Sequence, residues 1–408
     1  MTMRILLITA SFPYPPASGG AIRTYGILQG LHAAGHDITL LGFDDREDIA
    51  PDETPLAAFC SQIELFPPPK RNHLDRLRDL ILTRQSDIEG RLFSTTFAHR
   101  LRKLLHEADY DLIQFEGIEV AIYLSLVRQM GTGASLIYDA FNAEAELQRV
   151  IFAIDRREMK RWPAALYSWI QAQRITRFER AICQQADGVI AVSTEDASLL
   201  SAYRPDGHVH LLSSGIFVDH YNETSTSRDP GKNTLVFTGK MDYRPNVDAM
   251  IWFATAILPL IERQIPDVSL TIVGQKPHPR LNSLHDRPNI TLTGWVNSVE
   301  PYLKAASVYV APLRMGSGTR LKILEAMASG CAIVATMLAA AGLQIDAKEA
   351  MIIADSETDM AKAVTMLLKD PARRHQLGEA ARAQVKAHYD WSVLIPRLLA
   401  IYKELGLG

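Results

Sequence analysis

The sequence contains few cysteines and no long uninterrupted hydrophobic segment. Its cysteines, Cys60, Cys183 and Cys331, are odd in number and far apart, so they match neither a zinc-binding spacing nor a disulfide framework. This pattern favours a reducing compartment, and we expect a cytoplasmic protein. Residues 326–345 carry no charge, but Ser329-Gly330 divides them into a helix end and a strand. We therefore predict no membrane-spanning segment there.

A strong charge of one sign is also absent, since the 408 residues have a formal net charge of −3. Residues 1–230 contain 23 Lys and Arg against 30 Asp and Glu (−7), and residues 231–408 contain 20 against 16 (+4). The basic half would suit an anionic ligand such as a diphosphate, although chance also produces a difference of this size. A nucleic-acid-binding surface needs a much stronger basic bias, so no nucleic acid partner is predicted.

The sequence is organised as a repeated alternation of strands and helices. The opening MRILLITA reads as a buried strand, followed by the loop SFPYPPASGG, a helix and the strand DITLLGF. A second such series begins at TLVFTG and continues through SLTIVG, VYVAP and CAIVAT. The pattern predicts two doubly wound α/β domains. We place them at residues 1–218 and 233–390, with a polar linker at 219–232 and a C-terminal helix at 391–408 that packs back toward the N-terminal domain.

The segment RMGSGTRLKILEAMASG, which follows the strand VYVAP, carries the most specific chemical signal. Small residues before a helix allow an anion to reach backbone N–H groups, and the helix start favours negative charge. Arg320 and Lys322 stand in the first helical turn, where cations are unfavourable unless an anion is bound, so we expect a phosphate there. Glu325 could accept hydrogen bonds from a ribose. The loop residues are Gly316, Ser317, Gly318 and Thr319.

Glu325, followed by Ala-Met-Ala and Gly330, resembles the signature of the group 1 glycosyltransferases (glycosyltransferase family 4). The resemblance implies a GT-B fold, with two Rossmann-like domains facing a central cleft. It also implies transfer of a sugar from a nucleotide-diphosphate sugar to an acceptor hydroxyl, with retention, in polysaccharide or glycoconjugate biosynthesis. The family has an earlier Glu that contacts the transferred sugar, and Ser317 stands at that position here.

Three weaker matches add donor-binding candidates. In FTGKMDYRPNVDAM, Lys240 takes the position of a family Arg that reaches the diphosphate, and either Arg244 or Arg320 replaces a later Lys. Trp295 and Val296 resemble a turn that lies against the nucleotide base, although Trp295 could equally belong to the core. Gly19 and Gly20 resemble the glycine loop facing the donor phosphate, and Arg23 follows on the acceptor side.

The catalytic centre is predicted at strand ends in the N-terminal half. Glu116 is the best titratable candidate, and Asn142 lies near the place where the family often has a His. Asn142 can hydrogen-bond but cannot act as a base, and Glu144 is assigned to the acceptor side. The resemblance implies that the donor's own phosphate replaces a strong protein base. The predicted catalytic set is Glu116, Asn142, Lys240 and Arg320.

No metal and no cofactor are predicted, because the nucleotide sugar is itself a substrate and no His/Cys cluster has a metal-binding spacing. The acceptor is a sugar, a lipid-linked molecule or a small molecule. Residues 156–180 combine arginines with Trp162, Tyr167 and Trp169. They fit peripheral contact with an anionic membrane at its inner face, or a solvated helix face with buried aromatics.

Other functions remain open at the level of sequence. A non-hydrolysing epimerase would share the donor chemistry without an acceptor. A catalytically silent nucleotide-binding partner would fit the presence of Ser317. A dehydrogenase fits less well, because Leu321 occupies the third position of the dinucleotide-binding glycine motif. Turnover with an acceptor would distinguish a transferase from an epimerase and from a catalytically silent partner.

Overall fold

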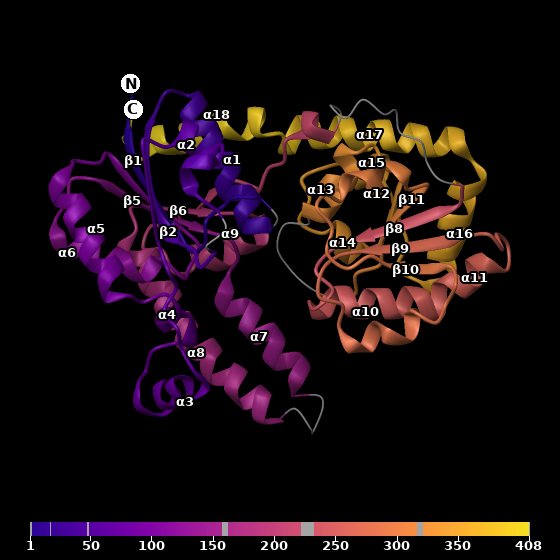
Figure 1. Ribbon diagram of the computed structural model, residues 1–408, viewed down its shortest axis with the longest axis horizontal. Helices are drawn as coiled ribbons and strands as arrows, with labels where there is room; N and C mark the ends of the chain where they lie inside the picture. The colour runs from indigo at the N-terminus through magenta and orange to yellow at the C-terminus, as the bar shows by residue number, and fades with distance from the viewer. Residues whose placement is uncertain are drawn as a thin grey trace. The chain divides into compact units, whose positions relative to one another are not determined.

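The computed structural model describes residues 2–16, 18–46, 49–156, 162–221, 232–315 and 321–407. The chain forms two compact units (Figure 1). The first unit contains the chain up to Gly215 together with the residues from Leu394 onward, and the second unit is Ile216–Val393. Each unit has its own parallel sheet and its own core.

The first unit is built on a seven-stranded parallel sheet with the order β3-β2-β1-β4-β5-β6-β7. The order reverses between β1 and β4, and ligands of such sheets bind at the carboxyl ends of the strands near this point. The register pairs Thr9 with Glu116 and Glu116 with Asp139, so three strand ends meet at one edge. The strands are β1 (Arg4–Thr9), β2 (Asp37–Phe43), β3 (Gln62–Phe66), β4 (Leu112–Glu116), β5 (Ser135–Ala140), β6 (Gly188–Ala191) and β7 (His210–Leu211).

Helices cover the sheet of the first unit. Helix α1 begins at Gly19 because the Ser18 side chain accepts a hydrogen bond from the Ala21 N–H (3.4 Å). The others are η1 (Pro51–Glu53), α2 (Leu56–Phe59), α3 (His73–Leu82), α4 (Asp87–Arg91), α5 (Thr95–Glu107), η2 (Ala121–Tyr123), α6 (Leu124–Met130), α7 (Glu144–Asp155), α8 (Trp162–Gln185) and α9 (Thr194–Ser201), after α1 (Gly19–Ala33).

The second unit repeats the same design with six parallel strands in the order β10-β9-β8-β11-β12-β13. Its order reverses between β8 and β11, so the carboxyl end of β8 is the equivalent binding position. The glycine-rich segment at 314–330 follows β11, as expected from the sequence. The strands are β8 (Thr234–Thr238), β9 (Ser269–Val273), β10 (Ile290–Leu292), β11 (Val308–Ala311), β12 (Ile333–Ala335) and β13 (Ile352–Ile353).

The helices of the second unit are shorter at its start than the sequence pattern predicts. The sequence of residues 247–264 predicts a single helix, but the structure forms three consecutive segments, α10 (Arg244–Trp252), η5 (Phe253–Ile257) and α11 (Leu258–Glu262), of which η5 is a π-helical turn. Pro259, at the start of α11, lacks the N–H that would continue the α-helical ladder. The helical segments are η4 (Val218–Tyr221), α10 (Arg244–Trp252), η5 (Phe253–Ile257), α11 (Leu258–Glu262), η6 (Pro279–Leu284), α12 (Glu300–Ala305), α13 (Leu321–Ala328), α14 (Met337–Ala340), α15 (Ala347–Ala350), α16 (Glu357–Lys369) and α17 (Pro371–Tyr389).

The boundaries between units fall before the predicted linker. The division lies between Gly215 and Ile216, and the start of the predicted linker, 219–221, is part of η4 in the second unit. The last helix, α18 (Trp391–Glu404), begins in the second unit and belongs to the first unit from Leu394 onward. Among the described residues, no helix has the length and apolar character needed to cross a membrane.

Candidate active site

The carboxyl end of β8 is closely packed around two glycines. Gly239 has a φ of +152°, and a Cβ at this position would lie 2.7 Å from the side-chain nitrogen of Asn246. A Cβ on Gly274 would lie 1.7 Å from the carbonyl oxygen of Gly239. Only glycine fits at both positions, and the result is a tight turn that leads directly into Lys240.

Asn246 and Lys322 are joined at this strand end. The Asn246 side chain donates to the Lys240 carbonyl (2.8 Å), and its oxygen accepts from the ammonium group of Lys322. The ammonium also lies 4.9 Å from the centre of the Phe237 ring. Lys322 is the second residue of α13, so a fixed cation stands at a helix start, where an anion is favoured.

Asn246 has a different role from the one suggested by its sequence position. Asparagine at the start of a predicted helix suggests a cap, but α10 begins at Arg244, and Tyr243, the residue at its cap position, makes no side-chain hydrogen bond. Asn246 is buried and positions Lys322 instead. Sequence analysis missed this role because the two residues are 76 positions apart.

The other predicted diphosphate contacts are only partly described. Lys240 is exposed after β8, and Arg244 is half-buried at the start of α10. Gly316, Ser317, Gly318, Thr319 and Arg320 lie outside the described residues. The choice between Arg244 and Arg320 as the second cation therefore stays a prediction.

Glu325 lies one turn further along α13 and is hydrogen-bonded to a residue that the sequence analysis did not select. The Tyr221 hydroxyl, from η4, donates to Glu325 Oε1 (3.3 Å). Burial raises the pKa of Glu325 to about 7, against the lowering effects of Tyr221 and Lys322. Glu325 and Lys322 thus come from the same helix and lie beside the same strand edge.

The Trp295 turn is exposed. Gly294 has a φ of +68° and forms an isolated bridge with Gly274, which holds the turn against the end of β9. Trp295 is 66% exposed, so the interpretation of this residue as packed core is wrong. Val296 packs partly against the core of the second unit.

In the first unit, the glycine pair starts α1 and packs closely on the end of β5. A Cβ on Gly20 would lie 3.0 Å from the Phe141 ring. Gly117, which follows β4 with a φ of +90°, lies against the same ring. Gly19 and Gly20 are therefore next to the carboxyl ends of β4 and β5, at the reversal point of this sheet.

Arg23 is buried and cannot reach an acceptor in this structure, which corrects its predicted role. Its guanidinium donates to both carboxylate oxygens of Asp139 (2.7 Å each) and to the Leu212 carbonyl (2.9 Å). The two side chains are 1% and 0% exposed. This bidentate ion pair joins α1 to the ends of β5 and β7.

Glu116, predicted as a catalytic residue at a strand end, is also fully buried and cannot contact a substrate in this structure. It accepts from Thr24 (3.1 Å) and Gln114 (2.6 Å), and Gln114 accepts from the Tyr402 hydroxyl of α18 (2.5 Å). Burial, and then the Asp139 carboxylate, raise the pKa of Glu116 above its ordinary value, while Arg23 lowers it. Glu116 and Arg23 belong to one internal polar network.

Asn142 and Glu144 remain at the surface at the end of β5. The Asn142 amide donates to Glu144 (3.2 Å), and both residues are half-buried. Burial, followed by repulsion from Glu119, raises the pKa of Glu144 to about 7. Glu119, which lies 3.5 Å from Arg91, is a charged neighbour that the sequence analysis did not select. Of the residues predicted for catalysis and the acceptor in the first unit, Arg23 and Glu116 are buried, whereas Asn142 and Glu144 are partly open to solvent.

Comparison with known proteins identifies the family. Residues 18–215 match the glycosyl transferase 4-like domain, and residues 232–370 match the glycosyl transferases group 1. The chain belongs to the group 1 glycosyltransferases, family 4. The family predicted from the sequence is confirmed.

Relatives of this glycosyltransferase include an uncharacterised 44.6 kDa protein in the cps region of Klebsiella pneumoniae. It is 20% identical over 399 residues, which are 95% of this chain and 96% of that protein. A phosphatidyl-myo-inositol mannosyltransferase of Mycolicibacterium smegmatis is 28% identical over 227 residues. That match spans only about half of each protein, 54% of this chain and 51% of the relative.

Solved structures establish the fold of the glycosyltransferase as GT-B. A sucrose-phosphate synthase from Thermosynechococcus elongatus superposes with a TM-score of 0.70 at 18% identity, covering 99% of each chain. Anabaena HepE in complex with UDP and glucose superposes with a TM-score of 0.66 at 14% identity, covering 98% of this chain and 100% of that one. The predicted fold class is confirmed.

Glu179 of the glycosyltransferase is a buried acid behind the Asn142–Glu144 pair. Its Oε1 accepts from the Glu144 backbone N–H (2.8 Å). Burial raises the pKa of Glu179 to about 8 from its ordinary value of 4.5, so the folded state favours the protonated acid. Stability from this group is present below pH 4.5 and is lost as the pH rises through about 8.

We therefore expect Glu179→Gln to reduce the pH dependence of stability. Glutamine keeps an oxygen for the Glu144 N–H and removes the ionisation. Between pH 5 and 8 the wild-type protein should lose roughly 3–4 kcal/mol more unfolding free energy than the variant, measured by urea denaturation. The exposed Glu195→Gln, from α9 of the same unit, is the control and should leave the pH slope unchanged. Equal slopes for wild type and Glu179→Gln would contradict the buried-acid assignment.

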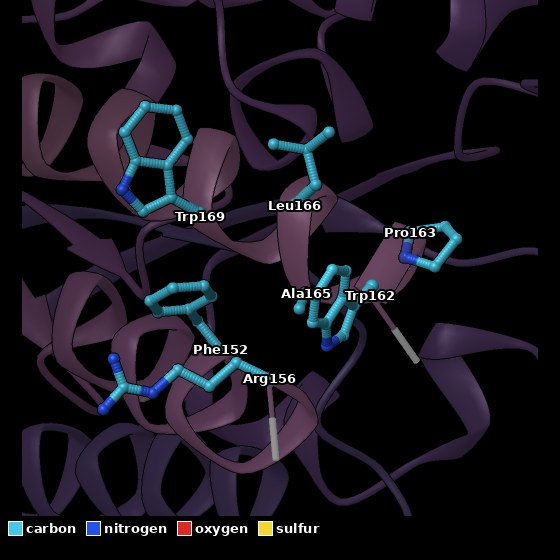
Figure 2. A pocket seen from close by; sticks show the side chains of 7 residues that line it. All are labelled: Phe152, Arg156, Trp162, Pro163, Ala165, Leu166 and Trp169. Carbon is cyan, nitrogen blue, oxygen red and sulfur yellow. The ribbon is translucent and has the colours of Figure 1, made fainter. Parts of the chain in front are cut away.

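The α7–α8 hairpin of the glycosyltransferase carries an apolar cavity of about 720 Å³, shown in Figure 2. Trp162 is 59% exposed and Trp169 is 47% exposed, so the interpretation with buried aromatics is wrong for these two residues. Arg174, one of the arginines of residues 156–180, donates to backbone carbonyls at the end of α3 and is not available to a membrane surface. The lining residues are Phe152, Arg156, Trp162, Pro163, Ala165, Leu166 and Trp169.

Proposed function

We propose that this glycosyltransferase moves a sugar, with retention, from a nucleotide-diphosphate sugar bound by the second unit to an acceptor hydroxyl bound by the first unit. The observation that carries the proposal is the fixed ammonium of Lys322. Asn246 holds it beside the backbone of Gly239 and Lys240, at the reversal point of the sheet. A cation held at a helix start is suited to a bound diphosphate.

The second unit would stabilise the departing nucleoside diphosphate. Lys322 and Lys240, together with Arg320, would neutralise the charge that develops on the diphosphate as the glycosidic bond breaks. Cationic side chains, and not a metal ion or cofactor, have this role in the proposal. Glu325 would accept hydrogen bonds from the ribose, and the exposed Trp295 offers a face for the nucleotide base.

The first unit would position the acceptor through Asn142 and Glu144. The two side chains are hydrogen-bonded to each other and partly open to solvent at the end of β5. They would orient the attacking hydroxyl, whose proton passes to the donor's own phosphate. Retention rests on the resemblance to the family, and the geometry of this pair supports the acceptor position.

We propose that the acceptor is lipid-linked and is used in polysaccharide or glycoconjugate biosynthesis at the cytoplasmic face of a membrane. One relative supports it, since it is named a phosphatidyl-myo-inositol mannosyltransferase. The apolar cavity of the α7–α8 hairpin supports a lipid-linked acceptor as well. Its exposed tryptophans lie beside Arg156, and this combination suits the boundary between hydrocarbon and anionic headgroups.

The experiment that tests the donor site is a thermal-shift panel with UDP, GDP, ADP, CMP and NAD. A ligand present at 100 times its dissociation constant adds about 2.7 kcal/mol of stability, enough for a clear shift. We expect stabilisation by one nucleoside diphosphate, and release of that diphosphate from its sugar donor once an acceptor is added. Stabilisation by NAD alone, or by nothing on the panel, would overturn the donor assignment.

Glu325→Gln should weaken binding of that nucleoside diphosphate by about tenfold or more, because a hydrogen bond to a charged group contributes about 1.5–3 kcal/mol. Isothermal titration calorimetry measures the change. The matched control is Glu379→Gln, an exposed position on α17 of the same unit, where affinity should be unchanged. Equal affinity in Glu325→Gln and wild type would remove Glu325 from the site.

Trp169→Ala should weaken binding to vesicles that contain phosphatidylglycerol by roughly tenfold, because a large apolar side chain contributes about 1.5–3 kcal/mol when buried. Cosedimentation measures this. Trp295→Ala, an exposed tryptophan of the second unit, is the control for vesicle binding and should have no effect on it. Equal vesicle binding by wild type and Trp169→Ala would contradict membrane contact through α8.

A further inference from the structure

Two histidines and a carboxylate meet where the last helix reaches the edge of the first sheet. His210 begins the edge strand β7, and His208 precedes it by two residues. Their rings are perpendicular, with centres 4.4 Å apart. Glu404 is the last residue of α18, and its Oε2 lies 3.4 Å from His210 Nδ1. One ligand atom from each of the three residues lies within 4.8 Å of the other two.

This arrangement is close to the geometry of a tetrahedral metal site. Zn²⁺ binds nitrogen and oxygen ligands at about 2.0–2.2 Å, which separates neighbouring ligand atoms by roughly 3.3 Å. The His210–Glu404 pair is already at this spacing. His208 and Glu404 are exposed, so rotation of their side chains can close the remaining distances. Two imidazoles and one carboxylate are a known ligand set for Zn²⁺ with a water in the fourth position.

The backbone that carries the histidines is held in place by an ion pair. Asp206 is paired with Arg204 (2.8 Å) and accepts from the backbone N–H of His208 (3.0 Å). Arg204 in turn donates to the Ala186 carbonyl at the end of α8 (2.6 Å). Fixed backbone before the first ligand lowers the entropy cost of forming a site.

We propose that His208, His210 and Glu404 bind one divalent transition-metal ion, of which Zn²⁺ is the best match. The ion would join the C-terminal end of α18 to the edge strand β7. Its role is structural and separate from sugar transfer. Two histidines alone do not make a metal site, which is why the sequence predicted none; only the fold brings Glu404, which is 194 positions from His210, to the same place.

The test is equilibrium dialysis of metal-free, untagged protein against Zn²⁺, with bound zinc measured by mass spectrometry. We expect one equivalent per chain in the wild type. Loss of a residue that hydrogen-bonds to a metal ligand lowers metal affinity about 10–100-fold. Loss of a ligand itself, in His208→Ala or Glu404→Gln, should lower the affinity at least as much. Both positions are exposed, and neither change should disturb folding. The matched control is His375→Ala, an exposed histidine on α17 that has Glu379 four residues later.

A second readout is the visible absorption of bound Co²⁺, which is strong only for a tetrahedral site and should disappear in His208→Ala. The proposal is overturned if the wild type binds no stoichiometric Zn²⁺, or if both ligand variants bind it as tightly as His375→Ala does. Neither result depends on turnover, so failure of this proposal is distinguishable from failure of the proposed transferase function.

Discussion

Replacing Arg23 by alanine is expected to lower the free energy of unfolding by about 3–5 kcal/mol, because it leaves a buried carboxylate without its partner. Arg23 makes two hydrogen bonds to Asp139 and one to the Leu212 carbonyl, and it is almost fully shielded from water. After the substitution, the Asp139 and Glu116 carboxyl groups would share a buried site with no cation. The loss should be measured by urea denaturation followed by circular dichroism.

The matched control is Arg4→Ala. Arg4 is also paired with an aspartate, Asp37 (3.0 Å), but the two side chains are 50% and 35% exposed, so loss of this pair should change stability little. The effect of Arg23→Ala should also grow as the pH rises. Burial raises the pKa of Glu116, so at pH 5 this carboxyl can hold a proton, whereas at pH 8 that proton is harder to retain. Equal effects of the two arginine variants would refute the buried-pair interpretation.

Lys322→Met is expected to lower kcat by about 10²–10³-fold, the effect of removing one preorganised group that stabilises transition-state charge. Methionine keeps the apolar stem beside Phe237 and removes only the ammonium. The protein without ligand should melt within a few degrees of the wild type, while stabilisation by the nucleoside diphosphate should be reduced. The double variant of Arg320 and Lys322 to alanine should lose nearly all turnover.

The control for Lys322→Met is Lys362→Met, an exposed position on α16 of the same unit, which should keep normal kcat. The measurement is the rate of nucleoside diphosphate release in the presence of acceptor. Near-normal turnover in Lys322→Met would contradict the proposal that the first turn of α13 binds the diphosphate. It would leave the family assignment intact, since that depends on the domain matches.

The sequence predicted the fold well because buried parallel strands are continuous apolar runs, such as MRILLITA, that are easy to recognise. It also placed Lys322 and Glu325 correctly on one helix after β11. Both successes depend on local pattern, in which neighbours in sequence are neighbours in space.

The failures concern residues whose environment is set by distant segments. Glu116 and Arg23 stand at a strand end and a helix start, which suggested an open site. Their burial comes from Asp139 and from Tyr402, which joins the network from α18 through Gln114. Nothing near residue 116 in the sequence indicates that a helix at the far end of the chain covers it. The polar character of a side chain alone cannot distinguish a catalytic group from a member of an internal network.

The division of α18 between the two units has a consequence for biosynthesis. The core of the first unit includes Leu398 and Tyr402, which are fully buried, and Gly30 and Gly188 lie against Ile395 and Leu405. These residues are translated after the whole second unit, roughly 10–40 s later at about 5–20 residues per second. The half of the protein that leaves the ribosome first is therefore completed last. Until then we expect the apolar surface that α18 covers to be open to water, and exposed surface of this kind promotes aggregation before folding is complete.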